Sequence, residues 1–484
     1  MEIHERRRRW LTLDALGFAA HWAWIWCVFW SNRFYDEGAA LESLVLSPVS
    51  MLEPLWVLSL FSNVVAIAAL LLVARVRNPL SELRSLPVEG AVLTALGTLC
   101  ASLVPDLVRP EAASTVYLMG AVLTGVGSAT VVVLWGERLA ECGPRYLVRC
   151  FVAAIFLGAA AYGLLAVLPP MASQVAVAAL PVVSMGIYLD QTRRRPRLPQ
   201  QYLNVRVRAR IPVPLVLVAL FFGFSFGLMK GLMAPVGPSW IAVRDALNIV
   251  AIVAAAGAFY VTSVVYRMDF DHLTYQVALP LVAAGFLFLP LREPLSVVGT
   301  AVYQFGYQYF YLVLWAIWAV LAAREKLPAA WVCAWGLLAI QIGQLAGSLA
   351  ADLGLGFLVG DGALAMLSAA VIFATLIVSL FVFSGRSAST GWGSVRPMEE
   401  EARAAEGRTL EDACDALSRR SRLTVRETDV FCLLARGRNR AFICKELVIG
   451  DETVKSHVKA IYRKLNVHSQ QELINLVEEE RAEG

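Results

Sequence analysis

The chain has 484 residues, of which 58% are hydrophobic and only 17% are charged, and its formal net charge is +4. Its mean hydropathy of +0.62 lies outside the usual range of soluble globular proteins, so the composition excludes a purely soluble chain and predicts an integral membrane protein. The eight cysteines are scattered, lie mostly in apolar runs and form no Cys-x-x-Cys pair. We interpret them as small buried hydrophobic residues and expect no disulfide framework, metal site or cofactor.

The first ten residues, "MEIHERRRRW", carry four arginines and lead into an apolar run. This run is about twenty residues long and has no small-residue cleavage site, which favours a retained first span over a cleaved signal peptide. We therefore expect the N-terminus to stay in the cytoplasm.

Apolar runs long enough to cross a bilayer as helices, about twenty residues each, recur as far as residue 384. They predict about twelve spans, although the third run is short and a count of about eleven or thirteen stays open. The expected spans are residues 11–30, 55–73, 91–104, 115–135, 146–168, 171–189, 213–229, 246–266, 273–289, 297–321, 331–349 and 363–383.

The distribution of positive charge supports an even number of spans. With a cytoplasmic N-terminus, the expected inner segments hold about 20 Lys and Arg residues and the outer segments about five, as cytoplasmic loops normally do. An even count returns the C-terminus to the cytoplasm. We therefore expect a multi-pass protein of the cell membrane with both termini in the cytoplasm.

The longest inner loop, "QTRRRPRLPQQYLNVRVRARIP", divides the spans six and six. This layout resembles a transporter of the major facilitator type, which is built from two six-helix halves. The loop "ARVRNPLSELRS" departs from that family's pattern because it lacks the Gly and the Asp-Arg pair. Few ionisable residues lie deep in the spans, Asp14 and Lys230 being the nearest, and this scarcity argues against coupled transport.

Polar and aromatic residues recur at helical spacing in the expected spans ten and eleven. Tyr303, Tyr307 and Tyr311 form one i, i+4 row. Aromatic rings together with a few amide groups are typical of the lining of a ligand pocket. The candidate pocket residues are Tyr303, Gln304, Tyr307, Gln308, Gln341, Gln344 and the mid-span His21. A second interpretation stays open, in which the Tyr and Gln side chains form hydrogen bonds between helices and line no pocket.

Two further patterns in the spans have structural interpretations. The tryptophans at the end of the first span, Trp22, Trp24, Trp26 and Trp30, are typical of an interfacial aromatic belt. The Gly-x-x-x-Gly pairs at 223/227 and 343/347 permit close helix approach, and we expect them to act inside one bundle rather than between copies.

After residue 385 the composition becomes rich in Gly, Ser and Glu, which predicts a linker over residues 386–418 between a transmembrane bundle, 1–385, and a soluble domain, 419–484. Thr424 and Glu427 form a capping box that starts a helix, and Gly437 ends it. A short helix, a turn at "VIGD" and an amphipathic basic helix follow, and these elements predict a helix-turn-helix. A second capping box, Ser469 with Glu472, opens a fourth helix.

The segment from Leu423 to Val477 resembles the LuxR-type DNA-binding domain. Leu-Thr-x-Arg-Glu at 423–427, Gly437, Thr-Val-Lys-x-His at 453–457 and Lys-Leu-x-Val at 464–467 match its signature. The resemblance implies a third helix that enters the major groove of promoter DNA, and pairing into homodimers through the fourth helix. The candidate DNA-binding residues are Thr453, Lys455, Ser456, Lys459, Arg463, Lys464 and Arg440.

The sequence therefore predicts an all-α protein, a polytopic bundle followed by a four-helix domain. We interpret it as a membrane-embedded, one-component transcription regulator of bacteria, whose bundle senses a small ligand or the state of the membrane. A transporter that also regulates transcription is the alternative. An enzyme is a poor third, because the chain has five histidines and no nucleophile motif or phosphate-binding Gly loop.

Overall fold

The structure is a computed structural model that describes most of both parts of the chain. The described residues fall into two compact units, divided between Met398 and Glu399, and each unit is considered by itself. The arginines at 6–9, the loop 195–212 and most of the expected linker lie outside them. The described residues are 12–30, 54–77, 79–102, 108–194, 213–232, 238–268, 272–291, 294–324, 327–357, 363–383, 413–414, 417–418, 420–421, 423–447 and 449–483.

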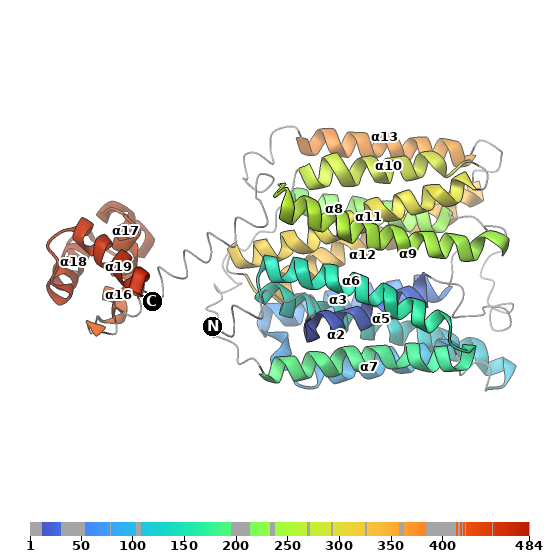
Figure 1. Ribbon diagram of the computed structural model, residues 1–484, viewed down its shortest axis with the longest axis horizontal. Coiled ribbons are helices and arrows are strands. Elements are labelled where there is room, and N and C mark those ends of the chain that lie inside the picture. Colours follow the sequence, from blue (N-terminus) through green and yellow to red (C-terminus); the bar gives the residue numbers. More distant parts are fainter. Residues whose placement is uncertain are drawn as a thin grey trace. The chain divides into compact units, whose positions relative to one another are not determined.

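The first unit is a bundle of long helices that lie alongside one another (Figure 1). Helices satisfy all their backbone hydrogen bonds internally, which is the condition for crossing a bilayer. The bundle consists of α2 (Leu13–Phe29), α3 (Pro54–Val76), α4 (Leu86–Ser102), α5 (Pro110–Glu141), α6 (Pro144–Ala166), α7 (Pro170–Arg194), α8 (Val213–Leu232), α9 (Pro238–Tyr260), α10 (Leu279–Phe288), α11 (Leu295–Arg324), α12 (Ala329–Phe357) and α13 (Ala363–Phe383).

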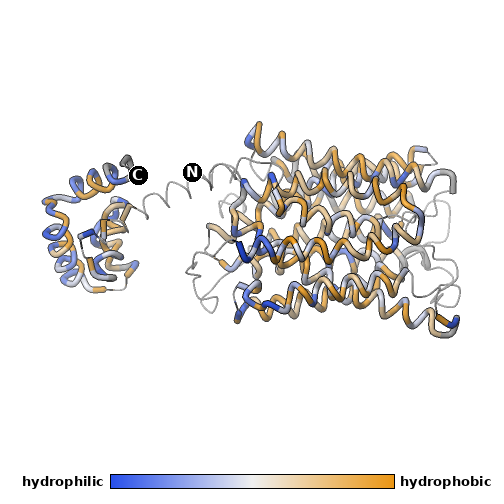
Figure 2. The backbone as a smooth tube through the Cα atoms, turned by 60° about the horizontal axis from the view of Figure 1, so that its bottom comes forward, coloured by the Kyte–Doolittle hydropathy of each residue, from blue (hydrophilic) through white to orange (hydrophobic). Residues whose placement is uncertain are grey.

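Each expected span overlaps one of these helices, although the expected span 246–266 continues from α9 into η3 (Val261–Val265) and the expected span 273–289 is divided between η4 (His272–Ala278) and α10. Within the described residues, eight helices are long and apolar enough to cross a membrane, and four shorter apolar helices accompany them. Hydrophobic residues run along most of the length of the bundle and hydrophilic residues gather near its ends (Figure 2). The unit is therefore a multi-pass membrane bundle, while the count of twelve spans stays a prediction.

Helices α8 and α12 make the closest approach in the bundle. A Cβ atom added at Gly227 would lie 1.9 Å from the carbonyl oxygen of Gln344, and one at Gly347 would lie 2.0 Å from that of Phe224. Gly223 and Gly343 are equally tight against the opposite backbone. Both Gly-x-x-x-Gly pairs therefore interlock within one bundle, as expected.

Buried charges lie near the ends of the helices rather than at mid-span. Arg138 Nε donates to Asp14 Oδ1 at 2.8 Å, so this arginine, expected among the inner-loop charges, is a buried partner in the last turn of α5. The neighbouring Glu137 accepts hydrogen bonds from the backbone N–H groups of Leu80 and Ser81 at 2.7 and 3.1 Å. These contacts tie α2, α5 and the turn η1 (Leu80–Glu82) together.

The second unit is a small helical domain with its own apolar core. It contains α16 (Val425–Ala435), α17 (Arg440–Leu447), α18 (Asp451–Leu465) and α19 (Gln470–Glu483). The capping box of Thr424 and Glu427 is present, and Gly437 ends the first helix region with a φ of +72°. Ser469 Oγ accepts a hydrogen bond from Glu472 N–H at the start of α19, also as predicted.

The packed domain reaches further toward the N-terminus than the expected boundary at residue 419. Ala413, Cys414 and Leu417 are helical and buried, and they belong to the same core as Val430, Phe431 and other residues of the domain. Ala413, Cys414 and Leu417 therefore pack on the domain, and we propose that the linker ends before Ala413.

Candidate functional site

Helix α18 separates an apolar face from a basic face. Val454, Ile461 and Leu465 are buried in the core of the domain. Lys455 and Lys459 are exposed on the other side, because residues spaced by four share a helix face. The helix is preceded by α17 and a short turn, so the two helices form the expected helix-turn-helix.

The basic residues of α18 share one groove with the start of α17. The groove has a volume of about 600 Å³, and its lining includes Arg440, Lys455, Lys459 and Arg463. Tyr462 and His468 complete part of its wall. The structure thus brings together four of the predicted DNA-binding residues around a concave, cationic surface, which is the form that a phosphate backbone or a base edge fits.

Lys455 is held in place by two acidic neighbours on its own helix. Its Nζ lies 2.6 Å from Glu452 Oε1 and 2.9 Å from Asp451 Oδ2. The hydrogen bonds to Glu452 and Asp451 raise the pKa of the ammonium, so the side chain is charged at neutral pH. The pairs are exposed to solvent and weak, so phosphate oxygens can replace them at small cost.

Thr453 and Ser456 are also exposed on α18, as the prediction requires. Lys464 differs from the other candidates, because its Nζ donates to Glu427 Oε2 at 2.6 Å and its side chain is only 27% exposed. This lysine joins α18 to α16 instead of lining the groove. The sequence alone does not reveal the pairing, since the two residues are far apart in the chain.

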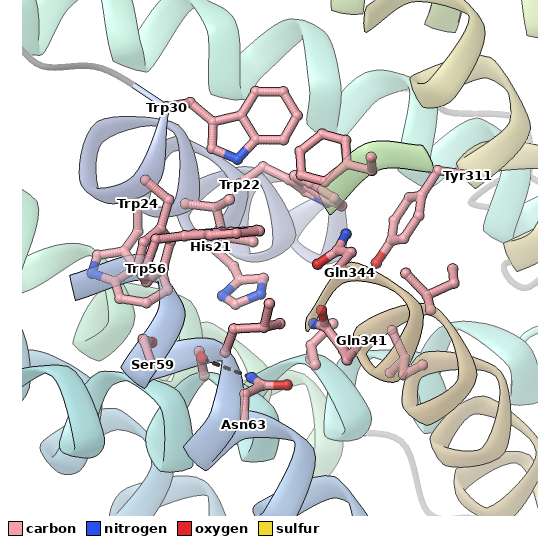
Figure 3. Close-up of a pocket in the computed structure, with 18 of the residues that line it drawn as sticks. His21, Trp22, Trp24, Trp30, Trp56, Ser59, Asn63, Tyr311, Gln341 and Gln344 are labelled. Atoms are coloured by element: carbon pink, nitrogen blue, oxygen red, sulfur yellow. Dashed lines mark hydrogen bonds between the residues drawn. The ribbon is translucent and has the colours of Figure 1, made fainter. Parts of the chain in front are cut away.

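The membrane bundle contains a cavity of about 110 Å³. Side chains from α2, α3, α5, α8, α11 and α12 line it, so helices from both expected halves contribute. The close-up in Figure 3 shows His21 near the middle, with Trp24 and Trp56 on one side and Gln341 and Gln344 on the other. The lining includes Trp22, Trp24, Trp30, Trp56, Ser59, Asn63, Tyr307, Gln308, Tyr311, Gln341, Gln344 and His21.

Five of the seven predicted pocket residues lie on this cavity, namely His21, Tyr307, Gln308, Gln341 and Gln344. Tyr303 and Gln304 do not line it. The hydroxyl of Tyr303 lies 3.1 Å from Ser225 Oγ, and its ring packs against Phe286, so this tyrosine joins helices. The structure does not place these two residues on the cavity, because they lie about one turn closer to the start of α11 than Tyr307 and Gln308.

Several buried polar atoms around the cavity have no hydrogen-bond partner among the described residues. They include both ring nitrogens of His21, Asn63 Oδ1, Gln308 Nε2 and Gln341 Oε1. Asn63 is oriented by its amide nitrogen, which donates to Ser128 Oγ at 3.1 Å and to the carbonyl of Gly125 at 3.2 Å. Burying such atoms without a partner costs free energy, so they mark a place where a ligand or water completes the bonding.

The tryptophans of α2 are buried rather than interfacial. Trp22, Trp24 and Trp26 are between 0% and 5% exposed, which contradicts their interpretation as a lipid-facing belt. Trp24 Nε1 donates to Thr98 Oγ1 at 2.9 Å and its ring stacks with His21. They form the core of the bundle and one wall of the cavity.

Sequence reasoning missed the contribution of α3. Trp56, Ser59 and Asn63 face the cavity from this helix. Their spacing of three and four residues places them on one face, and this pattern was visible in the sequence. It is a weaker signal than the denser Tyr and Gln rows of spans ten and eleven.

These features define two classes of module in one chain, a helix-turn-helix of the type used in bacterial regulators and a polytopic membrane bundle. Residues 421–477 match the family described as "Bacterial regulatory proteins, luxR family". Over 74 residues the chain is 35% identical to the HTH-type transcriptional activator RamA of Corynebacterium glutamicum, covering 14% of this chain and 26% of RamA. The chain thus spans about a quarter of the length of this relative, and its C-terminal domain is a LuxR-type helix-turn-helix.

The bundle is similar in fold to solved major facilitator structures. A bacterial homologue of the iron transporter ferroportin, in an outward-facing state, matches with a TM-score of 0.55 and 12% identity, over 77% of this chain and 98% of that one. The proton:xylose symporter XylE, of the major facilitator superfamily, matches with a TM-score of 0.50 and 13% identity, over 77% and 93%. At such identities the likeness concerns the fold alone, and it confirms the expected architecture.

Proposed function

We propose that the protein is a membrane-embedded, one-component transcription regulator. The observation that carries this proposal is the presence, in one chain, of a LuxR-type helix-turn-helix with an open basic groove and a membrane bundle with a cavity. The helix-turn-helix binds double-stranded promoter DNA through Lys455, Ser456, Lys459 and Arg463, with Arg440 at the edge and Thr453 beside them.

The cavity is the sensor in this proposal. A ligand that binds one conformation of the bundle more tightly than another shifts the population toward that conformation. The predicted linker is long, so a movement of the bundle is a poor way to set the position of the DNA-binding domain. The conformational change of the bundle therefore acts through pairing of the DNA-binding domains. Homodimers on two half-sites are the arrangement that this type of domain uses.

The orientation of the protein is part of the proposal. The excess of Lys and Arg on one side of the predicted topology places both termini in the cytoplasm of a bacterial cell. The DNA-binding domain then has access to the chromosome while the bundle stays in the cell membrane.

The experiment is a promoter reporter driven by the full-length protein. Replacing Lys455 and Lys459 together with Ala removes two cations from the groove, and the response is expected to disappear while membrane insertion is unchanged. The control removes two exposed arginines from outside the groove, Arg420→Ala with Arg426→Ala, and keeps the response. A full response in the lysine variant would refute the assignment of the reading surface.

A transporter that also regulates transcription is the second candidate, because the fold is that of the major facilitator structures above. The truncated bundle, residues 1–385, separates the two functions. Accumulation in membrane vesicles of the compound that drives the reporter would favour the transporter. Binding of that compound without accumulation would favour the pure sensor.

A further inference from the structure

The cavity lies near the middle of the bundle, and on α2 and α3 its lining is displaced toward one end. We define the near end as the end where α2 and α12 begin, and the far end as the end where they finish. On α2 the lining runs from His21 to Trp30, which is the second half of the helix, and on α3 it runs from Trp56 to Asn63, close to its start. The cavity therefore extends from the middle of the bundle toward the far end.

The near end is closed by an aromatic plug of five buried rings. Phe18, Phe151 and Trp315 meet with ring centroids 5.0 to 5.6 Å apart, so they join α2, α6 and α11. Trp135 and Trp318, which complete the plug, are at most 2% exposed. None of the five rings lines the cavity, and together they separate it from the near end.

Two glycines pack tightly at this plug, and one of them, Gly136, contacts the other half of the bundle. A Cβ atom added at Gly336 of α12 would lie 2.0 Å from the Trp318 ring, and one at Gly136 of α5 would lie 3.0 Å from Cys333 Cβ. Close packing of this kind among the described residues leaves little room for a solute at the plug, because protein interiors hold few voids larger than a water molecule.

Among the residues that the structure describes, the lining of the cavity contains no acidic side chain and no Lys or Arg. Lys230 lies beside it, but its Nζ donates to the carbonyl of Phe29 at 2.6 Å and lies over the Trp56 ring. A charged ligand would enter this site without a counter-charge, which is costly at low dielectric. The site therefore favours uncharged molecules.

The unpaired atoms define the bonding that the ligand must supply. Asn63 Oδ1 and Gln341 Oε1 are acceptors, Gln308 Nε2 is a donor, and His21 presents one of each when neutral. His21 is 1% exposed and stacks between Phe18 and Trp24, which fixes its ring toward the cavity. A volume of about 110 Å³ is somewhat smaller than the roughly 150 Å³ of an engineered cavity that binds benzene, so the site has room for one small molecule.

We infer that the cavity binds a small uncharged molecule, about the size of a single ring and carrying both donor and acceptor groups, that enters from the far end and makes its deepest polar contact with His21. This inference rests on the proposed function and specifies its ligand. With the termini in the cytoplasm, the far end faces outward, so the protein reports on a compound outside the cell.

Entry is tested with the full-length chain in whole cells and in inside-out vesicles, using an uncharged methanethiosulfonate reagent that an attached sugar makes membrane-impermeant. Ser59→Cys places a thiol on the cavity, and the matched control Ser184→Cys places one beside Trp135 of the plug, where Ser184 accepts its hydrogen bond. The unsubstituted chain gives the background of the native cysteines. We expect the reagent to label Ser59→Cys only from outside the cell and to label Ser184→Cys from neither side. Labelling of Ser59→Cys from the inside or from neither side would overturn the inference.

The ligand class is tested by protection of Ser59→Cys with three molecules of equal shape, benzamide, benzoate and benzamidine. Benzamide is uncharged and is expected to slow labelling, while the anion and the cation do not. His21→Leu is expected to raise the half-protecting concentration of benzamide about tenfold, with labelling from outside as proof that the variant is folded. Absent protection by benzamide, or stronger protection by either ion, would refute the class.

Neither readout depends on DNA binding. A failed promoter response with normal labelling and protection would therefore refute the regulator alone. Wrong-sided labelling with a normal promoter response would refute this inference alone.

Discussion

The ion pair of Glu427 with Lys464 makes the stability of the C-terminal domain depend on pH. Glu427 Oε2 accepts hydrogen bonds from Lys464 Nζ at 2.6 Å and from Thr424 N–H at 2.7 Å, and its side chain is only 9% exposed. These contacts lower the pKa of the carboxyl from 4.5 to about 2. A shift of this size stabilises the folded state by about 3 kcal/mol.

The perturbation is Glu427→Gln, which keeps a side chain that completes the capping box but removes the charge. Because the pKa of the folded state is depressed, the stability is present above pH 4.5 and is lost as the pH falls toward 2. We expect the variant to lose about 2 to 3 kcal/mol of unfolding free energy at pH 7 and progressively less below pH 4.5.

The assay is urea unfolding of a fragment of residues 399–484, a compact unit with its own core. The control is Asp429→Asn, since this side chain is 41% exposed and pairs with Arg426 at 3.5 Å. Its loss is expected to cost less than about 0.5 kcal/mol. A Glu427→Gln effect below about 1 kcal/mol at pH 7, or one that does not change with pH, would refute the reasoning.

Three further substitutions test the packing of each unit. Gly347→Ala forces a Cβ atom onto the carbonyl of the facing helix and is expected to lower the thermal stability of the detergent-solubilised protein sharply, whereas Gly163→Ala, which meets nothing within 4 Å, should leave it unchanged. Asp14→Asn leaves the buried Arg138 guanidinium without its counter-charge and should cost about 3 to 5 kcal/mol, measured on the same sample; an unchanged midpoint would show that the pair is dispensable. Gly450→Ser adds a hydroxyl cap at the start of α18, where φ is −71° and no side chain caps the helix, and should raise the unfolding free energy of the fragment by about 0.5 kcal/mol; a loss of stability would contradict the expected cap.

The sequence was sufficient to predict the elements whose signals are local. Twenty-residue apolar runs located the helices of the bundle, and the capping boxes at Thr424 and Ser469 located the starts of α16 and α19. The reason is that hydrophobic length and N-cap chemistry act within a few residues of the chain. Part of the cavity lining could be predicted, because Tyr307 and Gln308 belong to rows of Tyr and Gln residues that recur at i, i+4 spacing in the sequence.

Contacts between distant segments could not be predicted in this way. Arg138 lies near a helix end, where the charge pattern alone assigns it to a loop, and its partner Asp14 is 124 positions away. The place of Lys464 in the motif predicts a DNA-binding residue. Its ion pair with Glu427 could not be predicted, because only the fold brings the two residues together. Similarly, tryptophans near the end of a span have the same pattern whether they face lipid or the bundle core, and only packing decides between the two.

The most direct test of the central claim is recovery of chromosomal DNA crosslinked to the full-length protein in its own membrane. The account predicts enrichment of a small number of promoter regions, and loss of this enrichment when Lys455 and Lys459 are both replaced by Ala. Enrichment that survives both replacements, or recovery that is uniform along the chromosome, would contradict a regulator that reads promoters through α18.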